Sequence, residues 1–225
     1  MVSLYPAMLK LEGVPCLVVG GGRVAVRKIA SLLAHGAEVT VVALRFHPQV
    51  AEWVQAGTIV GYERGYEEKD GEGMRLVFAA TDSREVNMRF WRDARRRGQW
   101  VNVASAPELS DFHVPASVRK GKLTIAVSTS GASPALAADI ARRLSAQFGE
   151  EYERILDFLH ELRQYLLQNV AERNKRRKML KRMAQIDWHG IMRSGTFDFS
   201  VEEWAARLAR EALDGSTQEG ERSKE

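Results

Sequence analysis

Residues 14–25, VPCLVVGGGRVA, decide the fold of this 225-residue chain. The apolar run that opens the stretch is typical of a buried parallel strand, and the residues after the glycines recur at helical spacing. Gly20, Gly22 and Ala25 match the pattern G-x-G-x-x-A. In this pattern the first glycine permits a tight turn, the second lets the backbone approach a pyrophosphate, and the small third residue allows close helix–strand packing. The stretch therefore predicts a dinucleotide site at a helix N-terminus, with a simple connecting turn as the alternative.

The alternation of strand and helix continues through the first half of the chain. Further strands are expected over residues 39–43, 58–62, 76–80 and 100–104, and helices over residues 24–36, 50–55 and 84–97. The polar stretches 67–73 and 106–111 are predicted to be loops. Strands and helices that alternate at this spacing form βαβ units. Residues 1–112 are therefore predicted to be an α/β domain of the Rossmann type with a parallel sheet.

The pattern changes after residue 112. Residues 114–118 and 123–128 are predicted to form a β-hairpin joined by 119–122, followed by a helix from Pro134 to about Phe148. The two apolar runs would make a poor surface, so residues 113–148 are predicted to pair across a two-fold axis in a homodimer.

The last part of the chain is helical in pattern. Residues 150–184 read as almost uniform helix, and a last helix is expected over 201–213, with Ser200 as N-cap and Glu203 completing a capping box. A small all-helical domain over 149–213 and a disordered tail over 214–225 are therefore predicted.

Composition limits the possible classes of protein. The net charge is +4, which suits an anionic small ligand, and the single cysteine, Cys16, excludes an internal disulfide and a Cys-based metal site. The longest uncharged stretch, 123–138, is short for a membrane helix and contains Gly131 and Pro134. A soluble, cytoplasmic protein without a membrane partner is expected. Scattered histidines predict no resident metal, and the basic run 173–182 lacks interleaved aromatic residues, so no nucleic-acid partner is expected.

The choice between NAD and NADP stays open at this stage. An acid at the end of the second strand would hold a ribose hydroxyl, but that strand ends in Ala43-Leu44-Arg45. Arg45 and Arg23 could favour the 2′-phosphate of NADP, or they could be ordinary surface charges.

Several segments combine with the GGG-x-VA-x-RK stretch of residues 20–28. They are Val41–Leu44, Ala79–Asp82, Val101–Val103, Phe112–Ala116 and Ala126–Pro134. Over about residues 5–148 this combination resembles the precorrin-2 dehydrogenase family, which includes the N-terminal module of siroheme synthase. The resemblance implies a Rossmann domain, a dimerisation region and a helical domain. It also implies NAD-dependent oxidation of precorrin-2 to sirohydrochlorin, and in some members insertion of ferrous iron.

The resemblance also assigns the cofactor-binding residues. They are Gly20, Gly21, Gly22, Arg23, Val24, Leu44, Arg45, Thr81 and Asp82. The family pattern likewise lacks a ribose-binding acid, which favours NAD. The large methyltransferase module of the fused synthases does not follow, so this chain is not expected to make precorrin-2 itself.

One position departs from the family. Members with both activities carry Asp in an N-x-x-D pattern after the fifth strand, whereas here Asn102 is followed by Ser105. A serine is a poor general base and a poor iron ligand, so dehydrogenation without iron insertion is expected. Asp111 or His113, a few residues on, could supply the missing acid–base group. The alternatives are a bifunctional dehydrogenase and ferrochelatase, and a non-catalytic binding module.

A substrate loop is expected before the helix at Pro134. Precorrin-2 carries many carboxylates, and Ser128, Thr129, Ser130 and Gly131 combine hydroxyls, loop amides and a helix N-terminus into an anion site. Asn102 is predicted to join them in substrate binding. The alternative is an N-cap cluster without a ligand, since Ser133 before Pro134 is itself a good N-cap.

Overall fold

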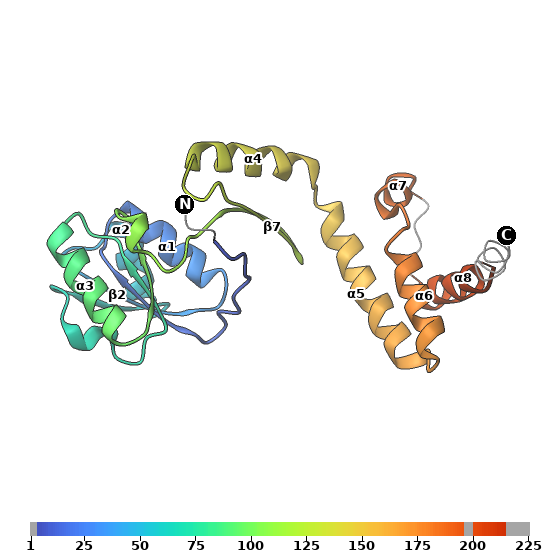
Figure 1. The fold of residues 1–225 in the computed structure, drawn as a ribbon, viewed down its shortest axis with the longest axis horizontal. Helices are drawn as coiled ribbons and strands as arrows, with labels where there is room; N and C mark the ends of the chain where they lie inside the picture. Colours follow the sequence, from blue (N-terminus) through green and yellow to red (C-terminus); the bar gives the residue numbers. More distant parts are fainter. Residues whose placement is uncertain (1–3, 196–199, 215–225) are drawn as a thin grey trace, which may run out of the picture. The chain divides into compact units, whose positions relative to one another are not determined.

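The computed structural model describes residues 4–195 and 200–214 (Figure 1). The chain divides into two compact units, with the boundary between Val114 and Pro115. The first unit is an α/β sheet structure, and the second contains a β-hairpin and five helices among its described residues. The helical content of the second unit agrees with the predicted change of pattern after residue 112. The finer predicted division, at residues 112 and 148, stays a prediction.

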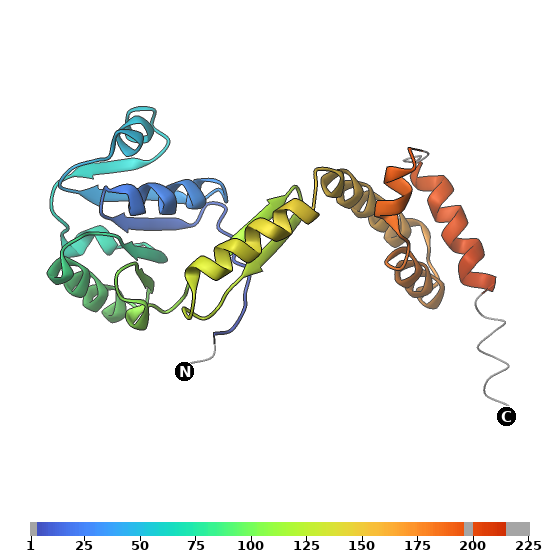
Figure 2. The ribbon, with the colours of Figure 1, turned by 90° about the horizontal axis from the view of Figure 1, so that it is seen from above.

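Five parallel strands form the sheet of the first unit, in the order β3-β2-β1-β4-β5 (Figures 1 and 2). They are β1 (Pro15–Val19), β2 (Glu38–Ala43), β3 (Val60–Glu63), β4 (Leu76–Ala79) and β5 (Trp100–Val103). The order reverses between β1 and β4, so the loop after β1 lies at a topological switch point, where open α/β sheets bind ligands. The predicted Rossmann-type sheet is confirmed.

Helices cover both faces of this sheet. They are α1 (Arg23–Leu33), α2 (Pro48–Gln55) and α3 (Arg84–Arg96). Ile29 of α1 and Val50 of α2 share one apolar core with Val18 of the central strand. Phe90 of α3 belongs to a second core with Leu17. Because neighbouring residues of a strand point to opposite faces, the two cores lie on opposite sides of the sheet.

Short elements differ from the sequence prediction. The loops expected at 67–73 and 106–111 contain the 3₁₀ helices η1 (Glu68–Gly71) and η2 (Pro107–Leu109). Glu67 and Asp70 form a capping box that stabilises η1. Strand β3 starts later than the predicted 58–62, because the amides of Thr58 and Ile59 bond to the carbonyl of Trp53 and close α2.

The first strand of the hairpin in the second unit lies two residues later than the predicted 114–118. Strands β6 (Ala116–Lys120) and β7 (Leu123–Val127) are antiparallel, and Lys120 pairs with Leu123. The predicted strand end at residue 118 and the connection over 119–122 are therefore wrong. Gly121 has φ +53°, and a glycine with positive φ at the first turn position permits a two-residue connection. Helix α4 (Pro134–Gln147) begins at its predicted N-cap, Ser133, and lies along the hairpin (Figure 2).

Four helices complete the second unit. They are α5 (Glu151–Asn169), α6 (Arg173–Met183), α7 (Trp188–Arg193) and α8 (Val201–Asp214). The uniform helix predicted over 150–184 is wrong, since α5 ends at Val170, whose carbonyl accepts a bond from Arg176 Nη1 at 2.8 Å. Helix α7 was not predicted. The four helices share a core that includes Phe158, Leu162, Trp188, Trp204 and Leu208.

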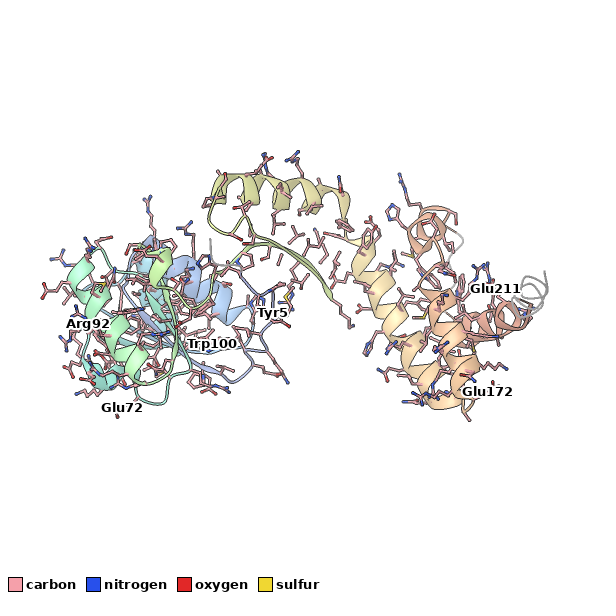
Figure 3. The ribbon with its side chains drawn as sticks, in the orientation of Figure 1. Tyr5, Glu72, Arg92, Trp100, Glu172 and Glu211 are labelled. Carbon is pink, nitrogen blue, oxygen red and sulfur yellow. The ribbon has the colours of Figure 1, made fainter. Side chains whose placement is uncertain are left out.

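The start of α8 agrees with the sequence. The Ser200 hydroxyl accepts the backbone N–H of Glu203 at 3.3 Å, as predicted for an N-cap. Further along α8, Glu211 pairs with Arg182 of the basic helix α6 at 2.7 Å (Figure 3). Within the described residues, no helix combines the length and hydropathy that a membrane crossing requires. Of the tail predicted over 214–225, residues 215–225 lie outside the described chain.

The core of the helical region allows a matched test on one helix. Leu162 is 0% exposed and Leu167 is 39% exposed, and both lie in α5. We expect Leu162→Ala to lower the free energy of unfolding by about 2–5 kcal/mol, because it removes buried methyl groups and leaves a cavity. Leu167→Ala should cost well under about 1 kcal/mol. Urea unfolding followed by circular dichroism measures both, and equal losses would contradict the packing described.

Candidate active site

The glycine loop after β1 brings three backbone segments into contact. Gly20 has φ +122°, and a Cβ there would lie 2.2 Å from the backbone oxygen of Ala80, at the end of β4. A Cβ on Gly21 would lie 2.2 Å from the backbone oxygen of Arg45, after β2. The N–H of His47 donates to the Gly21 carbonyl at 2.8 Å and ties the two loops together. Gly20 and Gly21 are therefore needed for the packing of the loop.

Gly22 differs from its two neighbours. Among the described atoms, none beyond the adjacent residues lies within 4 Å of the place that its Cβ would take. Gly22 is also the N-cap of α1, which has no side-chain cap in the described chain. The first N–H groups of α1 therefore have no side-chain cap among the described residues, which leaves them available to an anion such as a pyrophosphate. The tight turn predicted at Gly20 agrees with the structure, the pyrophosphate role of Gly22 stays a prediction, and the packing role of Gly21 was not predicted.

The residues that follow the loop divide between packing and exposure. Ala25 is fully buried against the sheet, in agreement with the small residue of the motif. Arg23 is exposed and Val24 is half-buried in the first turn of α1. After β2, the side chain of Leu44 is 77% exposed. The side chain of Arg45 is also exposed, and its backbone carbonyl is the one that lies against Gly21. The carboxyl end of β2 thus offers an apolar side chain and a cation, and no acid.

A hydrogen-bonded network follows β4. The Thr81 hydroxyl donates to Asn87 Oδ1 at 2.7 Å, and Asn87 Nδ2 donates to the Thr81 carbonyl at 2.9 Å. Asn87 Nδ2 also donates to the Ser105 hydroxyl, after β5, at 3.2 Å. Thr81 is half-buried, while Asp82 and Ser105 are exposed. The structure therefore brings Thr81 and Ser105 together through a buried residue that the sequence analysis missed.

A signal for Asn87 was present in the sequence. It lies three residues before Phe90 and seven before Ala94, on the buried face of α3. A polar residue at such a position needs hydrogen-bond partners, which marks it as worth attention.

Asp111 lies away from this network. Its Oδ2 accepts the N–H of Val101 at 3.0 Å, and its Oδ1 accepts from Arg95 at 2.6 Å. The Ser110 hydroxyl accepts the N–H of Val103, so the segment after η2 runs back along β5 toward the amino end of that strand. The sequence neighbourhood of Ser105 and Asp111 therefore does not bring their side chains together.

Asn102 contacts this returning segment, and His113 belongs to it. Asn102 is buried in β5, and its Nδ2 donates to the Phe112 carbonyl at 2.9 Å. The Phe112 ring meets Phe78 of β4 edge-on at 5.4 Å, and half-buried His113 follows it. The substrate role predicted for Asn102 and the catalytic roles predicted for Ser105, Asp111 and His113 stay predictions.

Lys28 is a cation of the glycine-loop helix that the sequence analysis did not single out. Its Nζ lies 5.7 Å from the centre of the Phe78 ring. Burial lowers the pKa of Lys28, and the neighbouring Arg27 lowers it further. The aromatic ring compensates part of the cost of burying this charge.

The predicted substrate loop belongs to the second unit. The Ser128 hydroxyl accepts the N–H of Ser130 at 3.1 Å, and the Thr129 hydroxyl accepts the N–H of Ser133 at 3.1 Å. Ser130 and Gly131 both have positive φ, at 52° and 85°. The loop is thus an ordered turn leading into α4, and Ser128, Ser130 and Gly131 are exposed. Within residues 4–195 and 200–214, no three His, Cys, Asp or Glu side chains group as metal ligands.

Family models match most of the chain in sequence. Residues 7–116 match a family described as "Putative NAD(P)-binding", and residues 120–147 match "Sirohaem biosynthesis protein central". The first match spans the sheet unit, and the second spans most of the hairpin and α4.

Curated relatives carry two names. A siroheme synthase of Methylococcus capsulatus is 40% identical over 181 residues, which are 80% of this chain and 38% of the relative. A precorrin-2 dehydrogenase of Priestia megaterium is 33% identical over 79% of this chain and 87% of the relative. The chain spans about two fifths of the length of the siroheme synthases that it matches.

A solved structure agrees with these matches. It is "SirC, precorrin-2 dehydrogenase", which has a TM-score of 0.74 and 29% identity, and covers 92% of this chain and 100% of its own. The glycine loop, the strand order and matches along nearly the whole chain agree with one another. The chain therefore belongs to the precorrin-2 dehydrogenase family, whose members include the siroheme synthases.

Proposed function

We propose that this protein oxidises precorrin-2 to sirohydrochlorin with NAD as hydride acceptor, in siroheme biosynthesis. The observation that carries the proposal is the match to a precorrin-2 dehydrogenase over 87% of that relative's length, in a chain that keeps an open glycine loop. When bound, NAD would supply the acceptor for the hydride that leaves the macrocycle, and a base of the protein would take up the accompanying proton.

The carboxyl edge of the sheet, formed by the ends of β1, β2, β4 and β5, fits a dinucleotide. The N–H groups at the start of α1, beside Gly22, suit the pyrophosphate. Exposed Leu44 suits the adenosine end, with Arg45 beside it. Thr81 and Asp82 suit the half of the cofactor nearer β4. The stretch Ala43-Leu44-Arg45 contains no acid that would bind the ribose hydroxyl of NAD. The activity assay described below therefore compares NADP with NAD.

For the proton acceptor, the contacts favour His113 over Asp111. Both carboxylate oxygens of Asp111 accept hydrogen bonds from other groups, whereas an imidazole is the side chain most often used as a general base. Ser105, exposed at the end of β5, is proposed to contact the substrate. Hydride transfer depends mainly on how the substrate is positioned, so a contact residue such as Ser105 can serve it without acting as an acid or a base.

The loop over 128–131 is proposed to bind substrate carboxylates, and Asn102 to support substrate binding. The Ser128 and Thr129 hydroxyl oxygens accept backbone N–H groups, so their own protons remain to donate to an anion. The exposed turn in the left-handed conformation adds the backbone N–H of Gly131, since that of Ser130 is bonded to Ser128.

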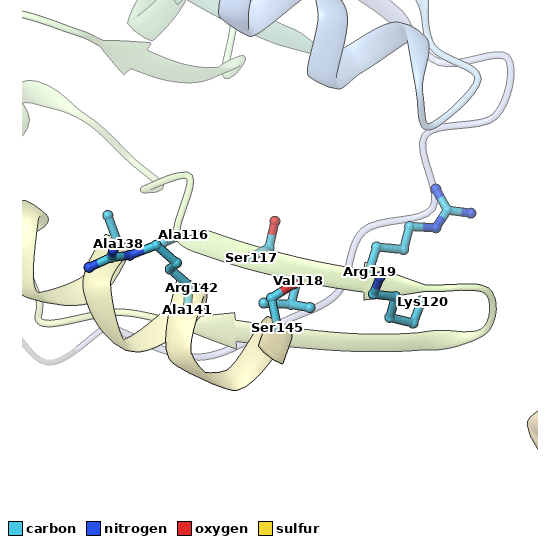
Figure 4. Close-up of a pocket in the computed structure, with 9 residues that line it drawn as sticks. All are labelled: Ala116, Ser117, Val118, Arg119, Lys120, Ala138, Ala141, Arg142 and Ser145. Atoms are coloured by element: carbon cyan, nitrogen blue, oxygen red, sulfur yellow. The ribbon is translucent and has the colours of Figure 1, made fainter. Parts of the chain in front are cut away.

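The second unit is proposed to form a homodimer. A two-stranded hairpin is marginally stable alone and leaves two strand edges without partners in its own sheet. Beside it lies an open hollow of about 480 Å³ between β6 and α4, with Val118 and Ala141 among its apolar lining and Arg119 and Arg142 among its cations (Figure 4). A second copy would cover these edges across a two-fold axis. A cytoplasmic location is proposed, since lone Cys16 is a buried thiol.

The activity can be tested anaerobically with precorrin-2 and NAD. We expect NADH and sirohydrochlorin to appear together, and NADP to be the poorer acceptor. Ferrous iron added afterwards should be inserted no faster than without protein, because Ser105 supplies no carboxylate. Accelerated iron insertion would favour the bifunctional alternative. No NADH or NADPH would contradict the proposed function and leave the non-catalytic binding module.

Two adjacent glycines separate cofactor binding from folding. Gly22→Ala places a methyl group in open space, so we expect a normally folded protein that binds NAD at least about tenfold more weakly. Gly21→Ala places the methyl group against the Arg45 carbonyl and should lower the free energy of unfolding by about 1–3 kcal/mol. Calorimetric titration with NAD and thermal unfolding measure the two effects. Equal NAD affinity in wild type and Gly22→Ala would contradict the proposed site.

Light scattering tests the homodimer. At micromolar concentration we expect a mass of twice 25.2 kDa. Ala126 is exposed on β7, so Ala126→Arg should weaken the dimer without unfolding the hairpin. Ala171→Arg, at an exposed position between α5 and α6, is the matched control and should leave the mass unchanged. A wild-type monomer at this concentration would exclude the proposal.

A further inference from the structure

Asn87 is a buried polar residue at the carboxyl edge of the sheet for which the proposed chemistry has no role so far. It is 3% exposed and lies on the face of α3 that carries Phe90. A buried amide costs free energy unless its groups are bonded, and this one is bonded to the segments that end β4 and β5.

The partners determine which way the amide faces. The Thr81 backbone carbonyl can only accept, so the atom 2.9 Å from it is the Nδ2 of Asn87. Asn87 Oδ1 then receives the Thr81 hydroxyl proton at 2.7 Å. The second Nδ2 proton points to the Ser105 oxygen at 3.2 Å. Both amide protons of Asn87 are therefore used, and the orientation of the amide cannot be reversed without leaving two acceptors face to face.

This orientation decides what Ser105 offers to a ligand. Because its oxygen accepts the Asn87 N–H, its own proton is directed elsewhere, and the side chain is exposed at the carboxyl edge. A freely rotating serine could present either a proton or a lone pair. We propose that Asn87 is a positioning residue that holds Ser105 as a hydrogen-bond donor toward an acceptor oxygen of the bound tetrapyrrole. The inference rests on the proposed function, whose substrate is rich in carboxylates.

The direct test reverses the hydrogen bond. Asn87→Asp keeps the shape of the side chain and replaces the Nδ2 donor by an acceptor, so Ser105 must turn its proton inward. The new oxygen also faces the Thr81 carbonyl, so a lower melting temperature is expected beside the change at Ser105. We expect kcat/KM for precorrin-2 to fall about ten- to hundredfold. If Asn87→Asp does not fold, Asn87→Leu is the second variant, because it removes the donor without adding an acceptor. It frees the Ser105 hydroxyl to rotate and should cost less than the reversal.

A double-mutant cycle separates positioning from simple loss of structure. If Asn87 acts through Ser105, Asn87→Asp should lower kcat/KM by less than about twofold in a Ser105→Ala background. A purely structural role would give losses that multiply. Asp93→Asn is the matched control on the same helix, because buried Asp93 accepts from Tyr66 at 3.1 Å and from Arg96 at 2.6 Å, in contacts that do not include Ser105. It should lower the melting temperature and leave kcat/KM within about twofold.

The same double-mutant cycle, measured as binding affinity in place of kcat/KM, distinguishes this inference from the proposed function. Affinity for sirohydrochlorin, followed by its absorbance, needs no turnover. Wild type that binds sirohydrochlorin but oxidises no precorrin-2 would contradict the proposed dehydrogenation, and coupling between the two positions in affinity would still support the inference. Multiplying losses, or wild-type values in Asn87→Asp and Asn87→Leu, would overturn the inference. Wild type that neither binds nor oxidises a tetrapyrrole would overturn both.

Discussion

The approach of backbone to backbone at the glycine loop is the constraint on which the first unit depends. At Gly20 and Gly21 a Cβ would lie 2.2 Å from a carbonyl oxygen, so no side chain fits without moving β4 or the loop after β2. Through these two contacts the end of β1 determines where the neighbouring loops lie. Gly22 has no such contact, which leaves the N-terminus of α1 open. Two of the three glycines therefore serve packing, and the third is the one proposed to serve the ligand.

The far side of the carboxyl edge is built differently. Beyond the backbone pairing of β4 and β5, the segments that follow these two strands are joined by side-chain hydrogen bonds of Asn87. The cofactor half of the edge thus depends on backbone packing, which tolerates little change. The half that would meet the substrate depends on individual side chains. A residue such as Ser105 can change the chemistry of this edge while the sheet beneath it stays the same, because its side chain is exposed.

These two halves also explain what the sequence could predict. The strands, the parallel sheet and the roles of Gly20, Gly22 and Ala25 follow from local patterns, since each depends on a few neighbouring residues. Asn87 was missed because its partners lie six residues before it and 18 residues after it. The end of α5 at Val170 was missed for a similar reason. Neither glycine nor proline marks it, and it depends on a core that Phe158 shares with Trp188 and Trp204.

The path of the chain after β5 bears most directly on the acid–base chemistry. Asp111 follows Ser105 by six residues, yet it bonds to Val101 because the segment reverses along the strand. A hydrogen bond from a backbone N–H to a carboxylate contributes about 1.5–3 kcal/mol. The bond to Arg95 contributes less, because that side chain is more than half exposed and screened by water. Loss of either contact would loosen the segment that precedes His113. Asp111 is therefore better suited to fixing this segment against β5 than to reacting with a substrate, which favours His113 for the proposed acid–base role.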